Sequence, residues 1–253
     1  MSELRAITVR VLHGDLRQAT YPVAVGHYVG DVIVHAEATL DAAFGGALRR
    51  RFDLGAYPGR VGESEIIPGG HFPPGAIIVG LGEVGELTPE RLQLVFAAAL
   101  RRYALEKAEA DNASTHIGVS SVLVGTDGGA FAGVTDSIHS IIRAVISVNR
   151  ALVDAQLADR AWIGEVEFVE LYEDVAIRSV QVVQDLTSIL AADLRNDIVL
   201  HCKPRLDIRP GGRFLRPADP YANGWWQRIA IRQKLADPAG ASQAWGWPWA
   251  AAA

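Results

Sequence analysis

The segment 123-LVGTDGGAFAGVTDS-137 has the residue types of a loop that could bind a phosphate group. Glycine adopts positive φ angles without strain, and free N–H groups at the start of a helix attract anions. The candidate ligand-binding residues of this loop are Gly125, Thr126, Asp127, Gly128 and Gly129. A structural interpretation stays open, in which Thr135 caps the following helix and the glycines only supply positive φ angles.

The glycine spacing of this loop is close to that of a nucleoside-triphosphate-binding motif, but the loop lacks the lysine of that motif. A Walker-type loop has the pattern G-x-x-x-x-G-K-[ST], and its lysine reaches the terminal phosphates. Gly128 and Gly133 have this spacing and Thr135 follows, but Val134 occupies the lysine position. The loop also lacks the Rossmann pattern G-x-G-x-x-G. Triphosphate hydrolysis therefore has no support, whereas binding of another anion stays open.

No catalytic residue, metal site or cofactor is predicted. Metal ligands normally recur at short spacings among histidines, cysteines and carboxylates. Such spacing is absent around the seven histidines, which are His13, His27, His35, His71, His116, His139 and His201. Cys202 is the single cysteine, which excludes an internal disulfide framework and a cysteine-rich zinc site, and fits a reducing cytosol.

Composition limits the classes of partner. The 253 residues carry a formal net charge of −5, which argues against nucleic acid or an anionic membrane held by bulk electrostatics. The first residues, MSELRAITVRV, do not resemble a signal peptide. Apolar runs stay well below the roughly 20 residues that a membrane-spanning helix needs. We expect a cytoplasmic protein with no nucleic-acid or membrane partner.

The loop must be positioned by a sheet and helices that the hydrophobic pattern predicts. Alternation and short apolar runs are typical of strands. Six strand-like segments are expected at 7–12, 22–36 with a break at Gly30, 64–68, 76–82, 116–125 and 166–172, and 197–208 is a candidate last strand. Helices are expected from Thr39 (or after Gly46) to residue 52, from Pro89, from Thr135, and over 173–192.

Two of these helices have a clear apolar face. Thr88-Pro89-Glu90 is typical of a helix start, with threonine as the cap and proline at the first helical position. The expected buried residues of the first helix are Leu92, Val95, Phe96, Ala99, Leu100 and Tyr103, and those of the second are Ile138, Ile141, Ile142, Val145, Val148, Leu152 and Val153. Alternating strands and helices of this length predict a mixed, mainly parallel sheet covered on both faces.

The last part of the chain differs in composition. We place one domain at 1–196 and a Pro/Gly/Trp-rich C-terminal extension, a linker or docking segment, at 197–253. Exposed tryptophans are costly unless they pack against a partner surface or the domain itself. The candidate docking residues are Trp225, Trp226, Trp245, Trp247 and Trp249. The segment 220-PYANGWWQRIAI-231 resembles the join that leads into caspase-like CHAT proteases in bacterial multidomain proteins.

The runs 31-DVIVHAEATLDAAFGGALRRRF-52 and 76-AIIVGLGEVGELTPERLQLVFAAALRRY-103 resemble the N-terminal domain of the leucine aminopeptidase family. The shared features are a Leu-Asp pair before a Gly-Gly helix, a "VGLG" strand and an "LTPE" helix start. The resemblance covers about residues 7–190 and implies a macro-domain-like, three-layer α/β/α fold. The printed chain has no "NTDAEGR" motif, so the resemblance does not extend to that family's catalytic domain or its metals.

The chain also resembles ADP-ribose-binding macro domains, whose first loop has the pattern D-A-I-V-N-A-A-N-x-x-L-x-x-G-G-G. Residues 31–46 match its hydrophobic frame and end in Gly45-Gly46, but His35 and Ala38 replace the two asparagines. Asp15, in Gly-Asp-Leu, matches the aspartate that holds the adenine amine in that family. The resemblance implies a cleft formed by Asp15, His35, Gly45, Gly46 and the glycine loop.

These observations predict a binding or assembly module without catalytic activity. Because the asparagine pair is replaced, hydrolysis at ribose is not expected. One alternative is a binder of an ADP-ribose-like nucleotide or another anionic small molecule. A second is a purely structural domain that forms a homo-oligomer or binds a protein partner.

Overall fold

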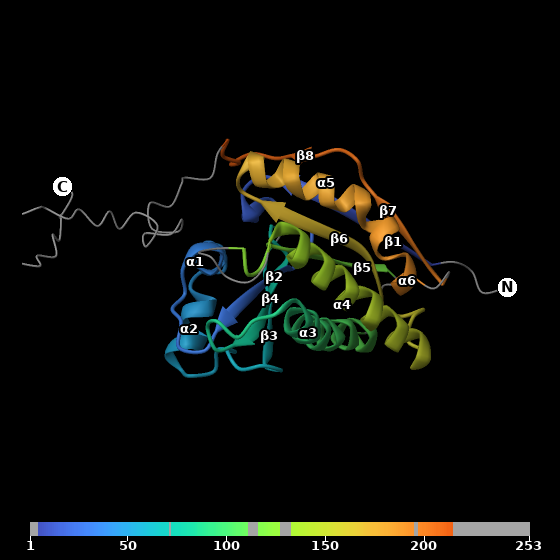
Figure 1. The fold of residues 1–253 in the computed structure, drawn as a ribbon. Coiled ribbons are helices and arrows are strands. Elements are labelled where there is room, and N and C mark those ends of the chain that lie inside the picture. Colours follow the sequence, from blue (N-terminus) through green and yellow to red (C-terminus); the bar gives the residue numbers. More distant parts are fainter. Residues whose placement is uncertain (1–4, 71, 111–115, 127–132, 195–196, 215–253) are drawn as a thin grey trace, which may run out of the picture. The chain divides into compact units, whose positions relative to one another are not determined.

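The computed structural model describes residues 5–70, 72–110, 116–126, 133–194 and 197–214 (Figure 1). The chain divides into two compact units, Met1–Ala218 and Asp219–Ala253. All described residues belong to the first unit. The candidate docking tryptophans lie outside the described residues, as do Asp127, Gly128 and Gly129 of the glycine loop.

One sheet of eight strands forms the centre of the described part. The strands are β1 (Arg5–His13), β2 (Val23–Tyr28), β3 (Ser64–Pro68), β4 (Gly75–Gly82), β5 (His116–Ser121), β6 (Trp162–Glu170), β7 (Ile198–Cys202) and β8 (Asp207–Ile208). Their order is β3-β4-β2-β5-β6-β1-β7, and β8 also pairs with β1. Strand β3 runs antiparallel to β4, whereas the other described pairings are parallel. The mixed, mainly parallel sheet predicted from the sequence is confirmed.

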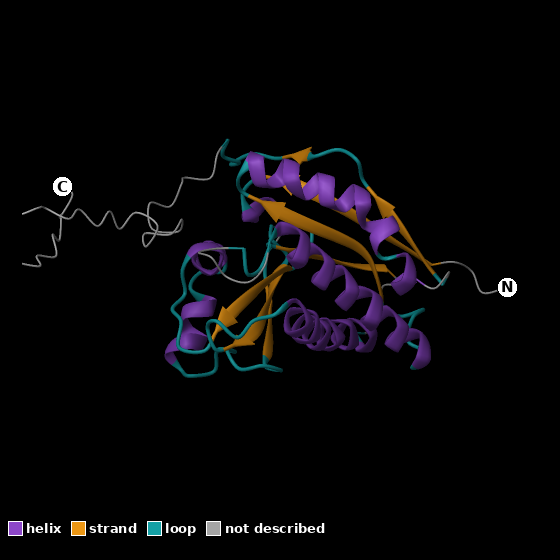
Figure 2. Ribbon diagram, in the orientation of Figure 1, coloured by secondary structure: helices purple, strands orange, loops and turns teal. Residues whose placement is uncertain are grey.

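Helices cover both faces of this sheet (Figure 2). They are η1 (Leu16–Gln18), α1 (His35–Ala43), α2 (Ala47–Asp53), α3 (Pro89–Glu109), α4 (Val134–Asp154), α5 (Glu173–Ile189) and α6 (Ala191–Leu194). Helices α3, α4 and α5 pack on the face that contains Ile7, Val9 and Val11 of β1. Helices α1 and α2 pack on the other face, where Leu12 points. The arrangement is a three-layer α/β/α fold.

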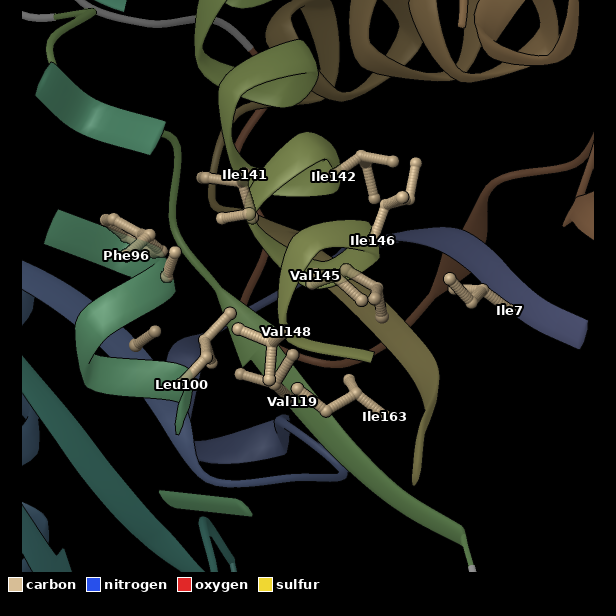
Figure 3. Close-up of a cluster of buried hydrophobic side chains, with 14 of the residues drawn as sticks. Ile7, Phe96, Leu100, Val119, Ile141, Ile142, Val145, Ile146, Val148 and Ile163 are labelled. Atoms are coloured by element: carbon tan, nitrogen blue, oxygen red, sulfur yellow. The ribbon is translucent and has the colours of Figure 1, made fainter. Parts of the chain in front are cut away.

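The larger core lies between the sheet and helices α3 and α4. Figure 3 shows Phe96 and Leu100 of α3 and Val145 of α4 converging on Val119 of β5 and Ile163 of β6. All five side chains are buried. Burial of each large aliphatic or aromatic side chain contributes about 1.5–3 kcal/mol, so this layer is the main source of stability for the central strands.

Helix α3 begins where its sequence predicts. The Thr88 side chain accepts a hydrogen bond from the Arg91 N–H (3.2 Å), and Pro89 occupies the first helical position. The expected apolar stripe of α3 is buried throughout. Because both the cap and the stripe are local features, the sequence alone was sufficient to place this helix.

Helix α4 differs from its prediction in two details. The cap position belongs to Gly133, not Thr135, and the Asp136 carboxylate accepts a 3.4 Å hydrogen bond from the Gly133 N–H. Val153, expected on the buried face, is 50% exposed because the last turn of the helix extends past the core. The other six predicted positions are buried.

The region around α1 is where the sequence prediction fails most. Residues 31–34 are not a strand, and α1 starts at His35, inside the segment expected to be extended. The helix expected over 39–52 is divided into α1 and α2, because Gly45 and Gly46 adopt φ angles of +61° and +81°. Strand β5 ends at Ser121, four residues before the predicted end.

The sheet continues beyond the domain boundary expected at residue 196. Strands β7 and β8 both pair in parallel with β1, so residues 198–208 are part of the sheet. The candidate last strand at 197–208 is therefore confirmed as β7 and β8. Its pairing with β1 could not be predicted from local composition, because that partner lies at the other end of the chain. None of the helices in the described part is both long and apolar enough to cross a membrane.

Candidate ligand-binding site at the carboxyl ends of the strands

Three of the predicted site residues, Asp15, His35 and Gly125, follow strands that belong to one group of four neighbours in the sheet. Strands β2, β5, β6 and β1 are adjacent in that order and parallel. The segments that follow them therefore meet at the same edge. Strands β1 and β2 are consecutive in the sequence but are separated in the sheet by β5 and β6. The order in which the chain adds strands to the sheet therefore reverses in this region. In open α/β sheets, such switch points are where ligands bind.

The described residues of the glycine loop have features that fit both interpretations, a phosphate-binding loop and a purely structural turn into α4. Gly125 has a φ angle of +78°, a conformation that residues with a Cβ atom adopt only with strain. The Ser137 hydroxyl accepts a hydrogen bond from the Val124 N–H (2.9 Å) and ties the loop to α4. Thr126, the next residue, is partly buried. Gly133 has a φ angle of −77° and needs no glycine for its backbone.

His35 lies at the start of α1 in a strained conformation. Its φ angle is +49°, which is uncommon for a residue with a side chain. The side chain is exposed, as are those of Val32 and Val34 just before it. Val34 occupies the cap position without a capping hydrogen bond from its side chain. The segment following β2 therefore presents an imidazole and a free helix start at the edge.

A buried polar cluster holds this helix start in place. Glu37, in the first turn of α1, accepts a hydrogen bond from the His27 Nδ1–H (3.0 Å) and one from the Tyr57 hydroxyl (2.8 Å). The rings of His27 and Tyr57 meet edge to face at 4.8 Å. Burial and the Glu37 carboxylate raise the pKa of the Tyr57 hydroxyl, so it stays a donor. The cluster ties α1 to β2 beneath His35.

Gly45 and Gly46 do not lie beside His35. They follow α1 and form the left-handed turn into α2, with Gly46 at the cap position of that helix. Residues 36–44 separate Gly45 from His35, and residues 36–43 of these belong to α1, a length of roughly 12 Å. The Gly45 carbonyl accepts a hydrogen bond from the Arg50 guanidinium (2.7 Å). In the structure these two glycines form the turn that joins α1 to α2.

Asp15 follows β1 at the edge, as expected, but its carboxylate is already engaged. It accepts hydrogen bonds from the Arg17 N–H (2.8 Å) and from two nitrogens of the Arg17 guanidinium (2.8 and 2.9 Å). These side-chain hydrogen bonds hold the pKa of the Asp15 carboxyl below its usual range. The group is therefore ionised and paired with Arg17.

Two glutamates of β6 matter to this region and were missed by sequence reasoning. Glu167 is fully buried between the sheet and the segment before β2. Glu170 ends the strand as the register partner of His13. Burial raises the pKa of the Glu170 carboxyl to about 8, although the Leu123 N–H donates a hydrogen bond to it. In the sequence, both residues are ordinary polar positions of a strand.

A Rossmann-type pattern is present outside the glycine loop, in 80-GLGEVG-85. In the structure, the first two glycines face another part of the chain. A Cβ atom at Gly80 would lie 2.2 Å from the Arg60 carbonyl oxygen, and one at Gly82 would lie 2.9 Å from Val61. Helix α3 begins only at Pro89 and has its own threonine cap. These glycines therefore serve chain packing rather than a dinucleotide.

Other surface features do not compete with this edge as a site. Two hollows of about 280 and 220 Å³ lie elsewhere, one between α3, α4 and α6 and one on the sheet beside Thr8 and Gly164. Arginines of the first hollow are paired with Asp193 and Asp197. Within the described ranges, no group of three or more histidine, cysteine or acidic side chains could hold a metal ion.

No family model matches the chain. Its sequence is 32% identical over 100 residues to a "Probable cytosol aminopeptidase" from each of two Acidithiobacillus ferrooxidans strains. The match covers 38% of this chain and 19% of the aminopeptidase, so the chain spans about a fifth of the length of these relatives.

Solved structures with a similar arrangement are macrodomains. A Trypanosoma brucei macrodomain in complex with ADP has a TM-score of 0.49 and 14% identity, with 69% of this chain and 68% of that chain covered. An Oceanobacillus iheyensis macrodomain mutant has a TM-score of 0.45 and 18% identity, with 72% and 92% covered. The Mycobacterium tuberculosis DarG macrodomain has a TM-score of 0.43 and 16% identity, with 63% and 96% covered.

The expected three-layer α/β/α fold with a mixed, mainly parallel sheet is confirmed by its layers and its strand directions. The sequence of the chain resembles part of a cytosol aminopeptidase.

Proposed function

We propose that this protein is a non-catalytic binding module for a phosphorylated, ADP-ribose-like small molecule. The ligand would bind at the carboxyl ends of β2 and β5. The observation that carries the proposal is the strained, exposed His35 at the start of α1. This helix follows β2, which pairs with β5, the strand before the Gly125 loop. Strain of this kind costs about 1–3 kcal/mol and persists where the surroundings impose it, often at ligand sites.

The chemistry of the two loops supports an anionic ligand. The start of α1 has N–H groups without a side-chain cap, and the positive end of a helix dipole attracts negative charge. The imidazole of His35 can donate a hydrogen bond in either protonation state. Gly125 brings the backbone of the adjacent loop to the same edge. Each charge-assisted hydrogen bond contributes about 1.5–3 kcal/mol, which supports micromolar to millimolar binding.

A binding role without chemistry fits the residues at this edge. His35 and Ala38 occupy the positions of the two asparagines in the macro-domain pattern. His27, the nearest buried histidine on β2, is engaged by Glu37. Asp15 is engaged by Arg17. The proposal therefore assigns no general base and no nucleophile to the site.

Replacing His35 with glycine tests this proposal against a matched control. Gln156 has a similar φ angle of +59° at the opposite end of α4, so Gln156→Gly relieves the same kind of strain away from the site. In both variants, the free energy of unfolding should be higher than in the wild type by several tenths to about 1 kcal/mol. Titration calorimetry with ADP-ribose and ribose 5-phosphate should show at least fivefold weaker binding for His35→Gly alone.

The outcomes separate the interpretations. Equal affinity in His35→Gly and the wild type would remove His35 from the site. Absence of a calorimetric signal for both ligands in the wild type would contradict the binding role itself.

An assembly role is a second proposal, favoured by exposed valines at the end of β4. Val61 packs against Gly82, and Val84 follows two residues later, 71% exposed. The Val29 N–H donates to the Gly82 carbonyl, which brings the exposed Val32 to the same region. Contiguous apolar surface often marks an interface. Light scattering should then show a homo-oligomer at micromolar concentration and a monomer for Val84→Asp; a monomeric wild type would exclude this role for the printed chain.

A further inference from the structure

Residues 209–213, here named the strap, cross the carboxyl ends of β1 and β6. After β8, the Arg209 N–H donates a hydrogen bond to the His13 carbonyl (2.8 Å). The Asp15 N–H donates to the Pro210 carbonyl (3.2 Å). Main-chain groups at the end of β1 are therefore bound by the chain itself.

The C-terminal end of the strap, at Arg213, is also held by main-chain hydrogen bonds. The Arg213 N–H donates to the Leu171 carbonyl (2.7 Å), and the Arg213 carbonyl accepts from the Glu173 N–H (2.8 Å). The same carbonyl lies 3.1 Å from His13 Nε2. These bonds close the end of β6 and the first turn of α5.

The strap packs directly on the side chains beneath it. A Cβ atom at Gly212 would lie 2.4 Å from His13 Nε2, and one at Gly211 would lie 2.7 Å from Asp15 Cβ. His13 is only 7% exposed as a result. No ligand atom can enter between the strap and β1 while the strap is in place.

Among the described residues, those that follow β2 and β5 are more exposed than those under the strap. Val32, Val34 and His35 after β2 are exposed, and Gly125 and Thr126 after β5 are partly so. Of the four neighbouring strands, the strap covers the ends of β1 and β6, so the described part of the edge that a ligand can reach lies over β2 and β5.

We propose that the strap limits how much of a ligand the site contacts, so that a phosphorylated single sugar fills the site and the rest of a longer nucleotide gains no contact over β1 and β6. This inference rests on the proposed binding function and makes it more specific. The preferred ligand class is a pentose phosphate or a compound of similar size. The strap, through Gly212 and His13, is the element that determines this specificity.

Gly212→Val tests the inference because its side chain cannot fit against His13. Gly70→Val is the matched control, since a Cβ atom at Gly70 meets nothing within 4 Å. Arg213→Pro opens the strap by a second route, because proline cannot donate the hydrogen bond to Leu171. Hydrogen exchange at the strap amides and the melting temperature would show that each variant is folded with the strap released.

Calorimetry with ribose 5-phosphate and ADP-ribose gives the result. In the wild type and in Gly70→Val, the two affinities should agree within about threefold. In Gly212→Val and Arg213→Pro, ADP-ribose affinity should increase at least tenfold while ribose 5-phosphate affinity stays unchanged.

The results that would contradict the inference differ from those that would contradict the proposed function. A wild type that binds ADP-ribose tenfold more tightly than ribose 5-phosphate overturns the inference and leaves the proposed function standing. An unchanged ratio of the ADP-ribose and ribose 5-phosphate affinities in both Gly212→Val and Arg213→Pro has the same consequence. Lack of binding of either compound to any variant overturns the proposed function and the inference together.

Discussion

Replacement of Glu167 by alanine is expected to lower the free energy of unfolding by roughly 3–5 kcal/mol. The Glu167 carboxylate is fully buried and 3.0 Å from the Arg10 guanidinium. It also accepts hydrogen bonds from the Thr20 N–H (2.8 Å), the Thr20 hydroxyl (3.0 Å) and the Ser120 hydroxyl (2.7 Å). Truncation leaves these donors without their acceptor, and each unsatisfied buried group adds to the cost.

Glu165 provides the matched control, because it lies two residues earlier on the same face of β6 and is partly exposed. Glu165→Ala should cost less than about 1 kcal/mol. Urea unfolding followed by circular dichroism measures both variants. Equal costs for the two alanine variants would show that the buried network does not hold the segment before β2 on the sheet.

The second large effect is a dependence of stability on pH that arises from Glu170. Burial raises the pKa of this carboxyl to about 8 in the folded protein, against 4.5 in the unfolded chain. Between these values the folded protein keeps a proton that the unfolded chain releases. The contribution of Glu170 to the free energy of unfolding therefore falls as the pH rises from about 4.5 to about 8, and is constant outside this window.

Glu170→Gln removes the titration and keeps the shape of the side chain. Each unit of pKa shift corresponds to about 1.4 kcal/mol, so the variant should gain roughly 2–5 kcal/mol over the wild type at pH 8 relative to pH 4.5. Urea unfolding at several pH values gives this difference, in which the other titrating groups cancel. Glu165→Gln is the control, and a difference curve without slope would contradict the assignment.

The same carboxyl links stability to ligand binding. Above pH 8 it adds a negative charge at the end of β6, beside the loop that follows β5. A phosphate at this edge would then be repelled. Anion affinity in the wild type should fall above pH 8, and the fall should be absent in Glu170→Gln.

Local patterns in the sequence were sufficient wherever the physics is local. The Thr88-Pro89-Glu90 start and the apolar stripe of α3 depend on residues within a few positions of each other. The alternation in β1 and the apolar run of β4 likewise predicted strands. The glycine at position 125 was correctly associated with a positive φ angle. From these elements follow the α/β class and the mainly parallel sheet.

Local patterns misled where packing overrides propensity. Val32, Ile33 and Val34 have β-branched side chains and predicted an extended segment, yet α1 begins at His35. The His27–Glu37–Tyr57 cluster explains this, because Glu37 must lie in a helical turn to reach both partners. The gain from that buried cluster offsets the strain at His35.

By itself, the sequence determined the fold class and the start of α3, and it placed Asp15, His35 and Gly125 near the ends of predicted strands. Tertiary structure alone decided which parts of the edge after these strands are exposed. Glu167 meets Thr20 across 147 positions of sequence, and the strap meets His13 across 200. No local pattern encodes such contacts, because each exists only after strands β1, β6 and β8 have paired. The accessibility of the site is therefore a property of long-range pairing, whereas its position follows from the order of strands and helices.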